Sequence, residues 1–278
     1  KRERGGGHDE SDIDASREDF ASRVQLVHMH LNLTVRPVLL PTARGRHVIR
    51  ESYAEEPVFK WLLGDVHSKK DPAAAQHKRD LLLDWMVDWR LDACQGFSHC
   101  LAIPSSAQQS PSRAGGGASS PGTGECEIKG CAIVTCPGSR AHEVSSFMSL
   151  LAYGASPPTP PAALGTGCKS RFAALEHMMR ARARLASESL HWYIHMVGVS
   201  PEHQGKGSGC MLMRIICALA DQDALPVHIE VSGSRNRAYF EQCGFRTMET
   251  VDVCSEDSPT LKVALMTRVP FPKSIELE

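Results

Sequence analysis

The stretch that decides the fold runs from Val197 to Gly209 and reads VGVSPEHQGKGSG, and an apolar run from Cys210 to Ala220 follows it. An apolar strand, a short turn and a glycine-rich loop thus lead directly into a helix. Such a loop aims several backbone N–H groups at one anion, and the helix N-terminus adds the positive end of its dipole. Glycine lets a phosphate approach the backbone closely and allows positive φ. The stretch therefore predicts a diphosphate cradle and a nucleotide-like cofactor.

Two other phosphate-binding motifs do not fit this stretch. A Walker loop needs Ser or Thr directly after its Gly-Lys, whereas Gly207 follows Lys206 here. The dinucleotide pattern G-x-G-x-x-G is absent, because Gly205, Gly207 and Gly209 alternate. On this stretch alone, a glycine-rich turn that merely joins a strand to a helix stays an alternative.

A second motif lies downstream, where residues 236–245 read NRAYFEQCGF, an Asn before an aromatic-containing helix that ends in Gly-Phe. The first stretch resembles the acetyl-CoA site of the GNAT family of N-acetyltransferases, whose Gln/Arg-x-x-Gly-x-Gly/Ala pattern is met by Gln204, Gly207 and Gly209. The second motif resembles the second signature of that family. The run 192–268 is closest in flavour to puromycin-type N-acetyltransferases, whereas the N-terminal half matches only in layout. Two ordered signatures favour the family over a connecting turn.

The resemblance implies a fold, a co-substrate and a set of contacts. The implied fold is α/β, with a mixed, strongly twisted sheet that is flanked by helices and splayed at the cofactor site. The implied co-substrate is acetyl-CoA, with no metal, and a backbone N–H near Val197 is expected to support the developing oxyanion. The residues assigned to acetyl-CoA are Val197, Gly198, Val199, Gln204, Gly205, Lys206, Gly207, Ser208, Gly209, Cys210 and Asn236. Two of these have ordinary alternatives: Lys206 as an exposed lysine without a specific role, and Asn236 as a helix-start residue.

The general base is expected on the strand before the loop. Strand alternation predicts that His191, Tyr193, His195 and Val197 share one face, opposite Trp192, Ile194 and Met196. His195 is the candidate because an imidazole titrates near neutrality. Relatives of the family place a base at positions that match Tyr193 or His195. A structural histidine, with a water relay as the base, is the alternative.

The general acid is harder to assign. Family members commonly carry Phe-Tyr-Glu before the final Gly-Phe, and that tyrosine protonates the departing thiolate. This chain has Tyr239, Phe240 and Glu241, so Phe240 takes the matching position and has no proton to donate. Either Tyr239 serves from a shifted helix, or the thiolate leaves unaided. General acid help is worth about 10²–10⁴-fold, so its loss need not abolish turnover.

Composition narrows the function classes. The 278 residues have a hydrophobic content of 42% and a formal net charge of −1, which supports a real core and argues against nucleic acid as a partner. No stretch approaches the ~20 apolar residues of a membrane-spanning helix. The ten cysteines are scattered, and the spacing of Cys126, Cys131 and Cys136 lacks the paired pattern of a zinc site. Reduced thiols suit a cytoplasmic location. The chain starts at Lys1, so we expect that a preceding segment is missing.

The chain is expected to form a disordered tail over 1–30 and a single GNAT domain over 31–270, with flexible insertions near 104–124 and 155–167. Asp84 and Asp88 are predicted on nearby faces of one helix, either solvated or lining a pocket for a cationic substrate. Four arginines of a later helix are predicted on a solvated face: Arg171, Arg180, Arg182 and Arg184. The ranges expected to be strands are 31–38, 96–103, 127–136, 191–199, 226–231, 245–253 and 261–268. The ranges expected to be helices are 44–63, 73–92, 171–186, 207–223 and 234–243.

The sequence therefore predicts an acetyl-CoA-dependent N-acetyltransferase that acts on a primary amine of a small molecule by direct attack in a ternary complex. One alternative is a non-catalytic acyl-CoA-binding or regulatory domain, which the order of Tyr239 and Phe240 motivates. Another is a protein or peptide N-acetyltransferase. The oligomeric state is not predicted.

Overall fold

The structure is a computed structural model that describes residues 10–33, 37–40, 45–64, 71–94, 99–105, 127–137, 159–186, 190–256 and 258–271. The described helices are α1 (Glu10–His30), α2 (Arg46–Tyr53), α3 (Pro57–Leu63), α4 (Pro72–Cys94), α7 (Gly165–Ala186), α8 (Ser208–Asp223) and α9 (Ser234–Gln242). The strands are β1 (Val38–Leu40), β2 (His99–Pro104), β3 (Ile128–Thr135), β4 (Trp192–Val199), β5 (Val227–Ser232), β6 (Arg246–Ser255) and β7 (Ser258–Arg268). Two short 3-10 turns, η3 (Ala162–Leu164) and η4 (Pro201–His203), complete the set.

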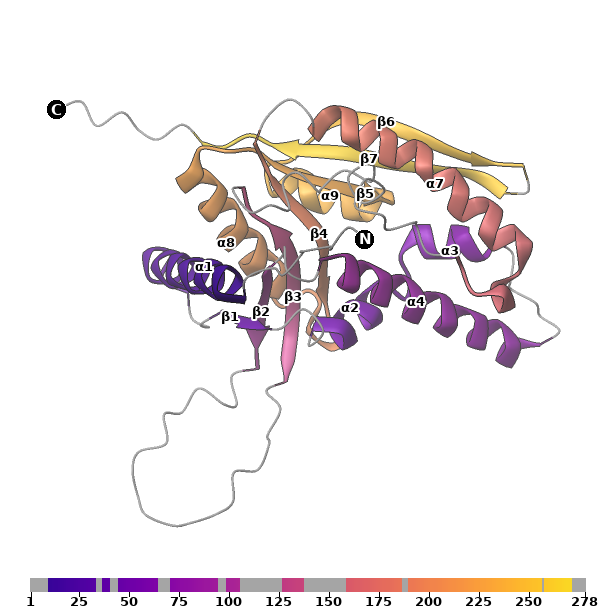
Figure 1. The fold of residues 1–278 in the computed structure, drawn as a ribbon, viewed down its shortest axis with the longest axis horizontal. Helices are drawn as coiled ribbons and strands as arrows, with labels where there is room; N and C mark the ends of the chain where they lie inside the picture. The colour runs from indigo at the N-terminus through magenta and orange to yellow at the C-terminus, as the bar shows by residue number, and fades with distance from the viewer. Residues whose placement is uncertain are drawn as a thin grey trace, which may run out of the picture.

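One seven-stranded sheet, ordered β1-β2-β3-β4-β5-β7-β6, runs through these elements (Figure 1). Among the described strands, β4 and β5 pair in parallel and every other neighbouring pair is antiparallel. The parallel pair is joined by the helical crossover α8, as a parallel connection requires. The expected mixed α/β sheet with flanking helices is confirmed. The strand expected over 31–38 is displaced, because residues 31–33 form the turn after α1 and the strand occupies Val38–Leu40.

The tail expected to be disordered over 1–30 is a helix in its described part, residues 10–30. Phe20, Val24 and Val27 lie about one helical turn apart and are buried at 1–3% exposure. The Phe20 ring stacks on His99 with 4.0 Å between centroids, and Arg23 bonds Asp223 of α8 at 2.8 Å. Three apolar residues at helical spacing suffice here because α8 and β2 provide the surface that they cover.

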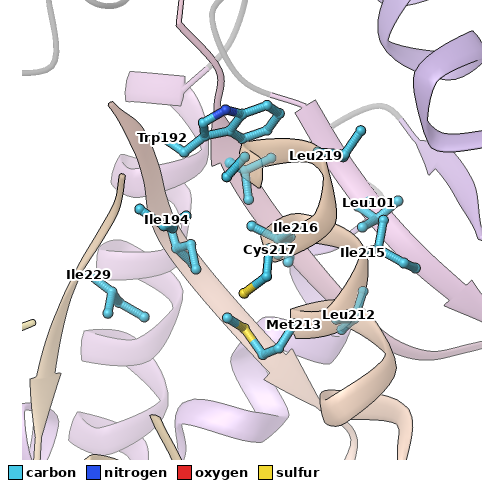
Figure 2. Close-up of a cluster of buried hydrophobic side chains, with 14 of the residues drawn as sticks. Leu101, Trp192, Ile194, Leu212, Met213, Ile215, Ile216, Cys217, Leu219 and Ile229 are labelled. Atoms are coloured by element: carbon cyan, nitrogen blue, oxygen red, sulfur yellow. The ribbon is translucent and has the colours of Figure 1, made fainter. Parts of the chain in front are cut away.

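Helices α1 and α8 cover one face of the sheet, and α2, α3, α4 and α7 cover the other (Figure 1). On the first face, Leu212 and Ile216 of α8 pack against Trp192 and Ile194 of β4 (Figure 2). Each such side chain contributes about 1.5–3 kcal/mol when fully buried. The second face has two clusters, one under α2 and one where α3, α4 and α7 pack over β6 and β7.

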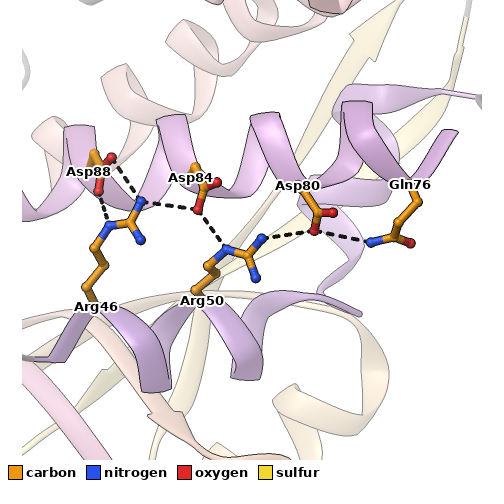
Figure 3. Close-up of polar contacts among 6 residues, drawn as sticks. All are labelled: Arg46, Arg50, Gln76, Asp80, Asp84 and Asp88. Carbon is orange, nitrogen blue, oxygen red and sulfur yellow. Dashed lines mark hydrogen bonds and ion pairs between the residues drawn. The ribbon is translucent and has the colours of Figure 1, made fainter. Parts of the chain in front are cut away.

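An ion-pair ladder joins α2 to α4 (Figure 3). Arg46 bonds Asp84 at 3.1 Å and also bonds Asp88, while Arg50 bonds Asp84 at 2.7 Å and Asp80 at 2.9 Å. All five side chains are at least 30% exposed, so each pair is worth only about 0–1 kcal/mol. Asp84 and Asp88 therefore face α2, and their charges are matched by arginines rather than by a substrate.

Two of the arginines expected on a solvated face point inward: Arg171 is buried, and the side chain of Arg182 is 12% exposed. Arg171 donates from Nε to the carbonyl oxygen of Leu62 at 3.0 Å and from Nη1 to the Ser258 hydroxyl at 2.8 Å. Gly64, at φ +63°, leaves room for this guanidinium, because an added Cβ would lie 2.7 Å from its Nη2 atom. Arg171 thus ties α7 to the end of α3 and to β7. Arg182 belongs to the site described below.

The two insertions expected to be flexible have different outcomes. Residues 106–126, most of the first, lie outside the described residues. In the second, residues 159–167 are described and hold η3 and the start of α7, with Leu164 buried in the α3–α4–α7 cluster. The expected single domain over 31–270 stays a prediction, and α1 packs on the same sheet.

Candidate functional site

The glycine-rich loop lies between η4 and α8, as the sequence predicts. Gly205 and Gly207 have φ of +72° and +89°, and no heavy atom lies within 4 Å of a Cβ built on either one. Gly207 is the N-cap of α8, and no side chain among the described residues caps this helix. The N–H groups of its first turn have no intrahelical acceptor. An open, uncapped helix start that lacks Cβ atoms fits a diphosphate.

The other loop residues that the sequence assigns to the cofactor lie around this helix start. Gln204 is exposed and donates from Nε2 to the carbonyl oxygen of Val199 at 3.1 Å. Lys206 and Cys210 are exposed, whereas Ser208 is 7% exposed. The loop therefore presents backbone N–H groups and one lysine to the solvent side.

Strands β4 and β5 pair only through Trp192–Val227 and Tyr193–His228 and then part. We call the opening beyond these pairs the β4–β5 gap. Because Ser200 N–H bonds Lys129 of the β3 side at 2.9 Å and antiparallel bonding alternates, Val197 and Val199 direct their backbone groups away from β3. Those groups face the gap, whereas the backbone of Gly198 faces β3. The Val197 N–H donates to the Tyr53 hydroxyl at 3.3 Å.

A β-bulge at His195 changes the expected faces of β4. The register passes from Ile133–Met196 to Val134–Ile194, so His195 is the extra residue. Met196 consequently packs with the cluster under α2, while Val197 packs with Ile194 on the α8 side. The expectation that Val197 shares a face with Tyr193 is wrong, because alternation fails across a bulge.

Two of the three expected catalytic side chains meet, since the Tyr193 and His195 rings lie edge to face with 4.7 Å between centroids. His195 Nε2 bonds the Thr135 hydroxyl at 2.6 Å. Tyr193 is 3% exposed and donates its hydroxyl to Glu230 of β5. Both groups therefore have protein partners at the closed end of the gap.

Arg182 completes a part-buried cluster with Tyr193 and Glu230. Its Nη1 atom donates to the Tyr193 hydroxyl at 2.9 Å and lies 3.4 Å from Glu230 Oε1. Burial would lower the pKa of Arg182, but Tyr193 and Glu230 outweigh it and raise that pKa above its ordinary value. A permanent cation thus links α7 to both walls of the gap.

The third candidate, Tyr239, points its hydroxyl at α8. A Cβ on Gly209 would lie 3.1 Å from that hydroxyl, which is buried without a hydrogen-bond partner of good geometry in the described structure. Burial, with the thiols of Cys243 and Cys210 nearby, raises the pKa of Tyr239 well above its ordinary value. Phe240 is 6% exposed and packs edge to face on Phe245 in the core. Asn236 donates to the carbonyl oxygen of Ser232 at 3.2 Å, which fixes the start of α9 to the end of β5.

A part-buried carboxylate at the mouth of the gap, Glu56, is not among the residues that the sequence predicts for the site. Glu56 caps α3, accepting from the Val58 N–H at 2.7 Å, and its other oxygen accepts from the Ser232 hydroxyl at the end of β5. Burial raises the pKa of Glu56 above the ordinary value, although these hydrogen bonds oppose the shift. An acid directly before Pro57 is a helix-start signal, but nothing local reveals that the cap faces β5.

A groove of about 630 Å³ opens beside the Glu56–Ser232 pair. Its lining includes the neighbours of both residues, Pro57 and Gly233. Three cationic side chains, Lys60, Arg237 and Lys262, also line it, and its described lining contains no carboxylate. Each cation has an exposed acidic partner just beyond the lining. The groove thus carries three cations, each paired with an acid beside it, and opens next to the Glu56 carboxylate.

Two wider searches concern the described part of the chain alone. None of its helices combines the length and apolar character needed to cross a bilayer. No group of three or more His, Cys, Asp or Glu side chains is arranged there to hold a metal ion.

Residues 170–245 match the sequence profile of the acetyltransferase (GNAT) family. An uncharacterised N-acetyltransferase from Schizosaccharomyces pombe is 34% identical over 83 residues, which are 30% of this chain and 33% of that relative. The matched part therefore spans only a third of the relative's length.

Among solved structures, arylalkylamine N-acetyltransferase 2 from Aedes aegypti has a TM-score of 0.47 and 16% identity, covering 85% of this chain and 99% of its own. The Drosophila melanogaster polyamine N-acetyltransferase has a TM-score of 0.47 and 12% identity, with coverages of 84% and 99%. The resemblance to puromycin-type enzymes stays a prediction. The profile match spans both the glycine loop and the 236–245 signature, so residues 170–245 form an acetyltransferase segment of the GNAT type.

Proposed function

We propose that this chain transfers an acetyl group from acetyl-CoA to a primary amine of a small molecule, by direct attack in a ternary complex. The groove selects the amine, and the β4–β5 gap holds acetyl-CoA. The observation that carries the proposal is the uncapped glycine start of α8, which lies at the end of β4 where β4 has parted from β5. If the diphosphate binds at that helix start, the backbone of β4 along the gap is free to bind the rest of the extended cofactor.

The chain's own residues divide the task of holding acetyl-CoA. The loop from Gln204 to Cys210 would bind the diphosphate through backbone N–H groups. The backbone groups of Val197 and Val199 would bind the pantetheine arm, because they face the gap. Once bound, acetyl-CoA supplies the thioester, and the Val197 N–H is the protein donor placed to bond its carbonyl oxygen.

Glu56 is our candidate for the group that takes the proton from the amine. A general base works best when its pKa lies near the working pH, and burial moves the pKa of Glu56 in that direction. The carboxylate lies between β5 and the groove, where an amine would arrive. His195, the base expected from the sequence, and a water relay are the competing assignments.

We propose that the thiolate leaves without a protein acid. The Tyr239 hydroxyl lies against Gly209, beside the diphosphate loop, and Phe240 is part of the core. A coenzyme thiol is acidic enough to depart as the thiolate, at a cost within the usual range of general acid catalysis.

The groove beside Glu56 is the proposed route of the acceptor. Its cationic lining disfavours a polycation, so we propose an acceptor whose non-reacting part is neutral or anionic. Exposed cations with exposed partners can exchange those partners for a ligand at little cost.

The cellular location that we propose is a reducing compartment such as the cytoplasm, because the eight described cysteines are free.

The test is a thiol-release assay with acetyl-CoA and four acceptor classes: neutral arylalkylamines, polyamines, amino acid amides and peptides. We expect thiol release with a small amine whose non-reacting part is neutral or anionic. The Gly207→Asp variant serves as the control for the cofactor site. Binding of acetyl-CoA without release by any acceptor would favour the regulatory alternative. Preference for peptides would favour protein acetylation.

A further inference from the structure

The Tyr53 hydroxyl oxygen accepts the hydrogen bond that the backbone N–H of Val197 donates. The distance from the amide nitrogen to the phenolic oxygen is 3.3 Å. This amide points into the β4–β5 gap rather than toward β3, as the hydrogen-bond alternation of β4 shows. The phenolic oxygen thus stands in for the acceptor that this N–H would meet during catalysis.

Tyr53 is held in place from three directions. It is the last residue of α2, and its ring meets Phe59 of α3 edge to face at 5.9 Å between centroids. Its carbonyl oxygen accepts from the Glu56 N–H at 3.0 Å, which closes the turn between the two helices. Glu56 in turn bonds Ser232 of β5. One turn, residues 53–56, therefore contacts both walls of the gap: Tyr53 reaches β4 and Glu56 reaches β5.

We propose that Tyr53 is a catalytic residue whose O–H group joins the Val197 N–H in bonding the thioester oxygen. This inference rests on the proposed function. As the amine nitrogen attacks the carbonyl carbon, the C=O π pair moves onto oxygen, where both donors stabilise it. When that pair re-forms the C=O bond, the C–S bond breaks and its electrons leave with the thiolate. The ammonium proton passes to Glu56, and Tyr53 keeps its own proton throughout.

The size of the effect distinguishes this role from a packing role. One oxyanion donor is worth about 10²–10³-fold in kcat, because it acts where charge develops. The Tyr53→Phe variant keeps the ring against Phe59 and removes only the hydroxyl. We expect its kcat to fall about 10²-fold, with the acetyl-CoA dissociation constant within about threefold of wild type. The control is Ser52→Ala, which removes a neighbouring hydroxyl that bonds the Ile49 carbonyl oxygen and lies against Gly198, whose backbone faces β3 rather than the gap.

A second readout is independent of any acceptor. Acetyl-CoA labelled with ¹³C at the carbonyl carbon is bound to the protein, and its resonance is recorded for wild type and both variants. Hydrogen bonding polarises the carbonyl, so we expect a downfield shift on binding that shrinks in Tyr53→Phe and persists in Ser52→Ala. Unchanged shift and unchanged kcat in Tyr53→Phe would overturn the proposal, as would tighter acetyl-CoA binding at constant kcat, which would make the hydroxyl a mere occupant of the amide. If no amine supports turnover, the proposed function fails, and the resonance alone decides the role of Tyr53.

Discussion

The Ser232 hydroxyl at the end of β5 donates a hydrogen bond to the Glu56 carboxylate at the start of α3, and 176 positions separate the two residues in the sequence. The pair connects the turn after α2 to the wall of the gap opposite β4. Its burial gives Glu56 the raised pKa on which the proposed chemistry depends. The first two predictions concern this pair.

Glu56→Gln should lower kcat/KM by about 10²–10⁴-fold, because the variant has no base of comparable position. A base works only when ionised, so wild-type kcat/KM should rise with pH through the raised pKa of Glu56. The measurement is the pH profile of kcat/KM for wild type and variant, and the rising limb should disappear in the variant.

Two further variants serve as controls for that profile. Glu55→Gln changes an exposed neighbour that pairs with Lys60, and it should keep the limb. His195→Ala should also keep it if Glu56 is the base. Loss of the limb in His195→Ala alone, with the fold intact by circular dichroism, would return the role to His195.

The same raised pKa predicts a pH dependence of stability. Burial raises the folded-state pKa of Glu56, so folding penalises its ionised form. This penalty is absent below the unfolded-state pKa and grows as pH rises through the folded-state pKa. The free energy of unfolding of Glu56→Gln minus that of wild type should therefore increase with pH over this window. Urea unfolding of both proteins at a series of pH values measures it, and a difference independent of pH would show that the burial penalty is compensated.

Gly207→Asp should weaken acetyl-CoA binding at least tenfold. The left-handed backbone at φ +89° is open to solvent, so the added carboxylate would face the diphosphate. Gly207→Asn is the matched control, because Asn and Asp both tolerate positive φ and differ here in charge. Titration calorimetry should give a clearly weaker affinity for Asp than for Asn. Equal affinities for Asp and wild type would place the diphosphate elsewhere.

Moving the hydroxyl between positions 239 and 240 tests the proposal that no protein side chain protonates the departing thiolate. Tyr239→Phe should leave kcat nearly unchanged, because the hydroxyl is buried against Gly209, and it should be neutral or slightly stabilising. Phe240→Tyr should cost about 1–3 kcal/mol of stability by burying a hydroxyl in the core, with no gain in kcat. Steady-state kinetics and thermal unfolding of both variants are the measurements. A large kcat loss in Tyr239→Phe would make that hydroxyl the acid after all.

Much of the C-terminal half was predictable because its signals are local. Helix α8 begins one residue after the glycine N-cap at 207, and Gly244 follows α9. The N-terminal half was predicted less well, since only Phe20, Val24 and Val27 are buried among the α1 side chains that the structure describes. The burial of Arg171 and Arg182 was missed for a related reason. A helix face that is polar in sequence becomes internal when other elements supply its partners.

The sequence by itself determined the shape of the glycine-rich loop, because positive φ at Gly205 and Gly207 and an uncapped helix start are properties of a dozen consecutive residues. It also carried the resemblance to the GNAT family, which the profile match over residues 170–245 supports. Only the tertiary structure decided which groups meet in the β4–β5 gap. The bulge at His195 turns Val197 to the other face, and the turn from Tyr53 to Glu56 crosses the gap. The contacts of Tyr53 with Val197 and of Glu56 with Ser232 join residues more than 140 positions apart. The burial that shifts the pKa of Glu56 exists only once the sheet, α2 and α3 have packed together.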